Sequence, residues 1–227
     1  MSRQLTFRLP VREALGRDDF FVSPANAWAV AMIEDWRGWP AGKLALTGPR
    51  GAGKTHLVHV WAAESGGRIV SAAELSEDLV PALAEGDLAV EDVPAIAGDK
   101  VRERALFHLH NLVLANGHTL LLTGAEAPGR WPLALADLTS RMQGTPAVRI
   151  EPPDDALLAA ILFKRLADRQ LTVEAELIHY LVPRIDRDFD TARRVVERLD
   201  ARALSEKREV RVPLAREVLA EITPEET

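Results

Sequence analysis

The sequence predicts an α/β domain with a five-stranded parallel sheet and helices on both faces, followed by a small helical domain. Short apolar runs alternate with helical patterns over the first two thirds of the chain, which is typical of parallel sheets. The runs are continuously apolar, as expected for strands buried on both faces. Beyond EPPDD (151–155) only helical patterns follow, so we place a boundary at Pro152 and Pro153.

Hydrophobic periodicity gives the order of the elements. In the first part we expect strands at 43–48, 68–70, 88–91, 119–124 and 147–150, and helices at 53–64, 75–85, 101–116 and near 132–142. In the second part we expect helices near 155–169, 174–183, 188–205 and 214–221, with a short VRV stretch at 210–212. The predicted domains are an extended tag (1–12), an α/β core (13–152) and a helical part (153–227).

The composition restricts the classes of function. The chain has 227 residues, a net charge of −6 and a pI of about 5.6, whereas domains that bind duplex DNA unaided usually have a pI above about 9. We therefore expect no direct sequence-specific DNA binding. No apolar run approaches the roughly 20 residues of a membrane span, and the N-terminus has no apolar signal region. Because cysteine is absent, disulfides and thiolate metal sites are excluded, and we expect a cytoplasmic protein.

The segment GPRGAGKT lies between a predicted strand and a predicted helix and fits G-x-x-x-x-G-K-[ST], the phosphate-binding loop or P-loop. In such a loop the backbone N–H groups and the positive end of the helix dipole bind phosphate. Lys54 would reach the β and γ phosphates, and the Thr55 hydroxyl would ligate Mg²⁺. The sequence thus predicts a site for ADP or ATP with Mg²⁺. Its expected P-loop residues, with the next helical residue, are Gly48, Pro49, Arg50, Gly51, Ala52, Gly53, Lys54, Thr55 and His56.

Two acids close the predicted strand 88–91. We expect Glu91 to hold Mg²⁺ through water and Asp92 to orient the attacking water. Ring-forming ATPases usually have aspartate first and then glutamate or aspartate, so Glu91 is one methylene longer than usual and Asp92 is one shorter than glutamate. Misplacement by about 1 Å can cost about 100-fold in rate. We therefore predict intact nucleotide binding and slow hydrolysis.

Further segments, in the expected order, resemble AAA+ proteins of the DnaA clade. They are FVSPANAWAV (21–30), VEDVPAIAGD (90–99), LLLTGAEAP (120–128) and DLTSRMQG (137–144). The resemblance implies an AAA+ P-loop NTPase domain with a helical lid. It also implies that Val22 lies in the segment that wraps the adenine, that Thr123 senses the γ-phosphate, and that Arg141 is an arginine finger acting on a neighbouring subunit. On spacing alone, Arg141 is better explained as a helix-end arginine on the C-terminal dipole, and it is the resemblance that favours the finger.

The chain departs from this clade in its third lid helix. Where the clade has the sensor-2 arginine, the alignment puts Asp190. Arg193 and Arg194 lie one helical turn later and are possible substitutes. The alternative is that Arg193, Arg194, Arg198 and Arg202 form a solvated helix face. The choice between ADP and ATP stays open for this reason.

Within the clade, the chain is most similar to the Hda group, because it ends in EVLAEITPEET where DnaA continues into a DNA-binding domain. This group binds the replication sliding clamp, the beta subunit of DNA polymerase III, and inactivates DnaA. The resemblance implies that QLTFRL docks on the clamp through Gln4, Leu5, Phe7 and Leu9. The alternative for this stretch is an N-terminal strand that pads the sheet edge.

The implied function is a regulator that promotes hydrolysis of DnaA-bound ATP and limits replication initiation, with homo-oligomers possible. Two alternatives are an autonomous loader-type ATPase and an assembly adaptor without catalytic effect. His56, His59, His108 and His110 lack a third metal ligand and are expected to be ordinary helix residues. We expect Trp28 and Trp61 in the core, whereas Trp36 and Trp39 flank a loop and could contact a partner.

Overall fold

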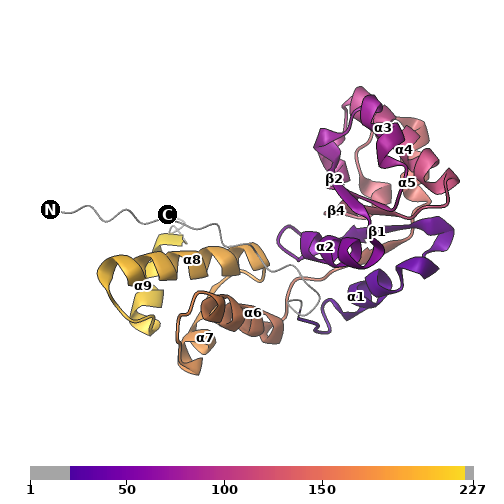
Figure 1. The fold of residues 1–227 in the computed structure, drawn as a ribbon. Helices are drawn as coiled ribbons and strands as arrows, with labels where there is room; N and C mark the ends of the chain where they lie inside the picture. Colours follow the sequence, from indigo (N-terminus) through magenta and orange to yellow (C-terminus); the bar gives the residue numbers. More distant parts are fainter. Residues whose placement is uncertain (1–20, 223–227) are drawn as a thin grey trace.

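The computed structural model describes residues 21–222 and has an α/β part and a helical part (Figure 1). The sheet consists of β1 (Lys43–Thr47), β2 (Arg68–Ser71), β3 (Leu88–Glu91), β4 (Leu120–Gly124) and β5 (Ala147–Arg149). Its strands are all parallel, in the order β2-β3-β4-β1-β5. The predicted sheet is confirmed, and the carboxyl ends of its strands meet at one edge.

Helices cover both faces of this sheet, as the continuous apolar strands predicted. The helices of the α/β part are α1 (Ala27–Glu34), α2 (Lys54–Ser65), α3 (Val80–Leu83), α4 (Lys100–Ala115) and α5 (Ala136–Gln143). In β4, Leu120 and Leu122 pack in a core cluster with α4 and α5, whereas Leu121 packs in a second cluster with α1 and α2. Because successive side chains point in opposite directions, the central strands β1 and β4 are buried on both faces, whereas the edge strands β2 and β5 are partly exposed.

The helical part, called the lid from here on, has its own core. It contains α6 (Asp155–Asp168), α7 (Ala175–Leu181), α8 (Phe189–Glu206) and α9 (Val212–Ile222). Leucine, isoleucine, valine and alanine side chains from all four helices form one buried cluster. The lid lies to one side of the sheet, beside α2 (Figure 1). The exact domain boundaries stay a prediction, and the expected clamp-binding residues Gln4, Leu5, Phe7 and Leu9 lie outside the described residues.

One expectation about a single element is wrong. The helix expected at 75–85 is only α3, preceded by a 3₁₀ turn (Glu77–Leu79). Pro81 lies in the first turn of α3, where its missing N–H costs no helical hydrogen bond. In the VRV stretch, Val212 already begins α9. None of the described helices is long and apolar enough to cross a membrane.

Three of the four tryptophan expectations also fail. Trp28 is 69% exposed, whereas Trp36 and Trp39 are only 8% and 4% exposed. The Trp39 ring stacks on the buried Trp61 at 6.1 Å, and its N–H donates to the Met32 carbonyl at 2.6 Å. The short helices after α1 therefore turn these two tryptophans inward, and only Trp61 is placed as predicted.

Candidate functional site

The P-loop connects β1 to α2 at the carboxyl edge of the sheet. Gly53 is the N-cap of α2 and has φ +94°, a conformation that glycine adopts without steric cost. Gly51 also has a positive φ (+75°), and its carbonyl accepts a hydrogen bond from Phe189 N–H of the lid at 2.9 Å. A Cβ on Gly51 would lie 3.0 Å from Asp188 Oδ1. The central glycine of the loop thus lets α8 approach the P-loop closely.

Lys54 lies across the P-loop. Its Nζ donates to the carbonyls of Gly48 at 2.8 Å and Pro49 at 2.9 Å. Burial lowers the pKa of Lys54, and the charges of Asp92 and Glu91 act in the opposite direction. The ammonium group is therefore held at the mouth of the loop, where exchanging carbonyl oxygens for phosphate oxygens requires only a local movement.

Thr55 and Glu91 are in direct contact. Thr55 Oγ1 donates to Glu91 Oε1 at 2.7 Å, so the first residues of α2 meet the end of β3. A hydroxyl and a carboxylate are hard oxygen ligands, which suit Mg²⁺. The described residues contain no group of three His, Cys, Asp or Glu that could hold a metal ion by itself. The donor set therefore fits an ion that completes its coordination with water and phosphate, as Mg²⁺ commonly does.

Asp92 follows Glu91 in an unusual backbone conformation. Its φ of 55° and ψ of 51° are left-handed, which costs a non-glycine residue about 1 kcal/mol or more. Its N–H donates to Oγ1 of the buried Thr123 at 2.9 Å. Thr123, the predicted sensor residue on β4, therefore holds the backbone of the second acid in place.

A cavity of about 1470 Å³ joins these groups to the lid. The α/β part contributes Arg50, Gly51, Gly53, Lys54, Thr55, His56, Glu91, Asp92 and Thr123, together with Phe21, Ser71 and Ala125. The lid contributes Leu157 and Ile161 of α6, Arg169 at the C-cap of α6, and Arg193 of α8, among others. Val22 is exposed and lies outside this lining, whereas its neighbour Phe21 belongs to it. The sequence alone did not single out Phe21 or the α6 residues.

The lid wall carries an arginine that is already paired. Arg193 and Asp190 both line the cavity, and their charged atoms are 2.6 Å apart. Arg193 also pairs with Glu197 at 2.9 Å. The Arg193 hydrogen bond is the main cause that holds the pKa of Asp190 below its usual value. Arg194 pairs with Asp190 at 3.5 Å but does not line the cavity. Of the two possible substitutes for sensor 2, only Arg193 faces the site.

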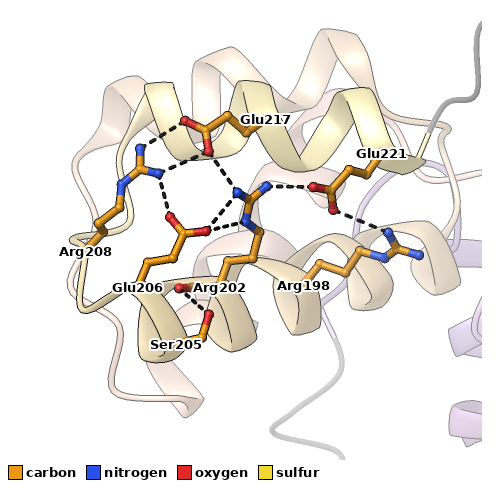
Figure 2. A network of polar contacts seen from close by, with 7 residues as sticks. All are labelled: Arg198, Arg202, Ser205, Glu206, Arg208, Glu217 and Glu221. Carbon is orange, nitrogen blue, oxygen red and sulfur yellow. Dashed lines mark hydrogen bonds and ion pairs between the residues drawn. The ribbon is translucent and has the colours of Figure 1, made fainter.

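The other two arginines of α8 point away from the site and toward α9 (Figure 2). Arg202 pairs with Glu221 at 2.7 Å, Glu206 at 2.8 Å and Glu217 at 3.1 Å. Arg198 pairs with Glu221 at 3.8 Å. The arginine-rich face is therefore divided between the cavity and an ion-pair network inside the lid.

Arg141 lies apart from the cavity. It is an exposed residue in the last turn of α5 and is not among the residues that line this chain's own cavity. Its carbonyl accepts hydrogen bonds from Thr145 Oγ1 at 2.9 Å and Lys43 Nζ at 3.3 Å. Within residues 21–222, its guanidinium has no carboxylate partner.

Comparisons with known proteins agree with this architecture. Residues 154–219 match the family model described as the lid domain of Hda. The structure is similar to domain III of the replication initiation protein DnaA from Thermotoga maritima, with 21% identity, a TM-score of 0.80, and coverage of 94% of this chain and 98% of that one.

Two further solved structures have the same fold. AMPPCP-bound DnaA from Aquifex aeolicus is 20% identical, with a TM-score of 0.65 over 84% of this chain and 68% of that one. The RuvB Holliday junction branch migration motor from Thermotoga maritima is 19% identical, with a TM-score of 0.70 over 91% of this chain and 71% of that one. The chain therefore has the fold of DnaA domain III and of RuvB, and its residues 154–219 are similar to the lid domain of Hda.

Proposed function

We propose that this chain is a nucleotide-binding regulator that docks on the replication sliding clamp and presents Arg141 to the ATP held by DnaA. Hydrolysis of that ATP would limit replication initiation. The observation that carries the proposal is the separation of Arg141 from the cavity that Lys54, Thr55 and Glu91 line. An arginine outside its own cavity is suited to complete the site of another protein.

The chain's own cavity would hold ADP or ATP with Mg²⁺. Lys54 would exchange its two carbonyl partners for phosphate oxygens, while Thr55 and Glu91 would hold the ion directly and through water. Bound Mg²⁺ would neutralise part of the phosphate charge. The AMPPCP-bound DnaA of similar fold supports this assignment. Because Glu91 and Asp92 have the less common side-chain lengths for their positions, we expect slow turnover by the chain itself.

Arg141 would act in the site of DnaA. A guanidinium placed against transferring phosphate stabilises the charge of the transition state, and such fingers are worth roughly 10³ to 10⁵ in rate. Its exposure and its lack of a carboxylate partner in the described part of the chain support this role.

The test of this role compares Arg141→Ala with Arg149→Ala, a matched exposed arginine on the same part of the molecule. Wild type and Arg149→Ala should accelerate hydrolysis of DnaA-bound ATP in the presence of clamp, and Arg141→Ala should lose at least 100-fold of that acceleration. Equal acceleration by all three proteins would contradict the proposal.

The clamp contact is proposed for Gln4, Leu5, Phe7 and Leu9. The support is the extended glutamine-leucine pattern, in which apolar side chains fill a preformed cleft. A Gln4→Ala/Leu5→Ala variant should lose clamp binding. A Thr6→Ala/Arg8→Ala control, which changes the side chains expected to point outward, should keep it. Clamp binding by both double variants would mean that the tag has another role.

An autonomous loader-type ATPase is the second candidate, because the Thr55–Glu91 contact is also what the chain's own hydrolysis would require. Arg141 would then act between copies of this chain in a homo-oligomer. A loader would show turnover that single-stranded DNA or a helicase partner increases. An adaptor would keep its function in the Arg141→Ala variant.

A further inference from the structure

A buried lysine lies directly behind Arg141. Lys43, the first residue of β1, is 8% exposed, and within residues 21–222 it has no carboxylate partner. Its Nζ is 3.2 Å from His110 Nε2 of α4 and 3.3 Å from the Arg141 carbonyl of α5. Buried ammonium groups are usually paired with carboxylates. The Lys43 ammonium instead contacts the His110 imidazole and the backbone carbonyl of Arg141, the proposed arginine finger.

The hydrogen-bond chain fixes the state of His110. Because an ammonium only donates, Nε2 of His110 must accept, and the ring proton is on Nδ1. Nδ1 is 3.3 Å from Asn111 Oδ1, which accepts this proton. Burial, followed by the charge of Lys43, lowers the pKa of His110 to about 4, so the ring is neutral at pH 7. The neutral imidazole therefore holds Nζ in place without cancelling its charge.

The Arg141 carbonyl needs such a donor. It belongs to the last turn of α5, where carbonyls lack the amide that a longer helix would supply. The Thr145 N–H, which would reach Arg141 in a continued helix, donates to Met142 at 2.9 Å instead. Lys43 and the Thr145 hydroxyl replace it. A cation at this end of a helix also interacts favourably with the helix dipole.

Lys43 also affects the guanidinium through its charge. The charge of Arg141 is one of the two causes that lower the pKa of Lys43, so the two cations lie close enough to repel. His110, the third titratable group of this cluster, is neutral and offers the guanidinium no negative partner. The repulsion disfavours folding of the Arg141 side chain back over the sheet.

We infer that Lys43, held by His110, is the positioning residue of Arg141: it caps the helix end at this residue and keeps the guanidinium directed outward. This inference rests on the proposed action of Arg141 on a partner's ATP. It assigns a role to Lys43 of β1 and His110 of α4, neither of which would contact the partner's nucleotide.

The test is a double-mutant cycle between Lys43→Met and Arg141→Ala, measured as hydrolysis of DnaA-bound ATP. Lys43→Met removes the charge and keeps a long apolar side chain. It should lower the rate at saturating protein about tenfold, with the half-saturating concentration and the chain's own nucleotide affinity unchanged. In the Arg141→Ala background it should have no further effect. An equal loss in both backgrounds, or no loss in either, would overturn the inference.

A second readout separates this inference from the proposed function. The ¹⁵N order parameter of Arg141 Nε–H, measured by NMR on the chain alone, should fall in Lys43→Met. It should fall less in His110→Phe, which lacks the Nε2 acceptor but has a similar shape. If these values fall while Arg141→Ala leaves hydrolysis unchanged, the proposed function is wrong and the positioning role stands. If they do not change, the positioning role is wrong.

Discussion

The α/β wall and the lid wall of the cavity hold their charged groups in different ways. On the α/β side, Thr55 donates to Glu91, and Lys54 donates to backbone carbonyls of the P-loop. On the lid side, arginines and carboxylates at the cavity neutralise one another, as Arg193 does with Asp190 and Glu197. On the α/β wall, Lys54 would exchange neutral carbonyl partners for phosphate. On the lid wall, Arg193 would have to exchange carboxylate partners.

This difference extends beyond the cavity. In the α/β part, Glu103 is completely buried and accepts hydrogen bonds from the backbone N–H groups of Gly98, Ala134 and Leu135. In the lid, polar contacts between α8 and α9 are mostly ion pairs between partly exposed side chains (Figure 2). Single substitutions of buried polar residues should therefore lower the stability of the α/β part, whereas the polar contacts of the lid should weaken as salt is added.

Glu103→Gln should have the largest effect on stability. Glutamine keeps one accepting oxygen, but its NH₂ cannot accept, so either the Gly98 N–H or the Leu135 N–H would lose its acceptor and face a second donor, at about 1–3 kcal/mol. We expect the free energy of unfolding to fall by about 3 kcal/mol, measured by urea denaturation. Glu206→Gln in the lid is the control and should cost much less, because its ion pairs are screened by water. Equal losses in the two variants would remove the contrast between the two parts.

Acid should destabilise the α/β part through His110. Its pKa is about 4 in the folded chain and about 6.5 in the unfolded chain, so between these values the unfolded state binds more protons. The contribution of His110 is therefore constant above about pH 6.5, and the free energy of unfolding falls as pH drops toward 4. The fall is on the order of 3 kcal/mol. Urea titrations at several pH values should show this slope in wild type and a smaller slope in His110→Asn.

Asp190→Asn should free Arg193 of the lid from its ion pair. Without the Asp190 carboxylate at 2.6 Å, Arg193 could bind phosphate more readily. The substitution would also remove the repulsion between the Asp190 carboxylate and phosphate. We expect about 3- to 10-fold tighter ATP binding by calorimetry, since exposed ion pairs are worth about 1 kcal/mol or less. The part of the gain that comes from Arg193 should be lost in Asp190→Asn/Arg193→Ala compared with Arg193→Ala, which leaves only the relief of repulsion. An equal gain in the two backgrounds would show that Arg193 does not contact the nucleotide.

The α8–α9 network should give the smallest effect. Arg202→Ala removes three ion pairs, but its partners are partly exposed and screened by water. We expect only a small decrease in Tm at low salt, and a smaller one at high salt, by thermal denaturation. A large loss that does not depend on salt would mean that packing of the arginine stem matters more than its charge.

Local patterns predicted the sheet, the P-loop and the acids, because each depends on residues that are neighbours in sequence. The Phe189–Gly51 and Lys43–His110 contacts join distant segments and could not be found in this way. The left-handed backbone of Asp92 is held by a hydrogen bond to Thr123, which is also far from it in the sequence. The exposure of Trp28 and the burial of Trp39 depend on how α1 packs, since their spacing allows either face.

The central claim is that Arg141 promotes hydrolysis of the ATP bound to another protein, and not of the ATP bound to this chain. The most direct measurement is single-turnover hydrolysis with labelled ATP loaded either on DnaA or on this chain before the two are mixed with clamp. We predict that label on DnaA is hydrolysed only with Arg141 present, and that label on this chain is hydrolysed at the same slow rate in wild type and Arg141→Ala. Arg141-dependent hydrolysis of the chain's own ATP, with no effect on the ATP of DnaA, would contradict the claim.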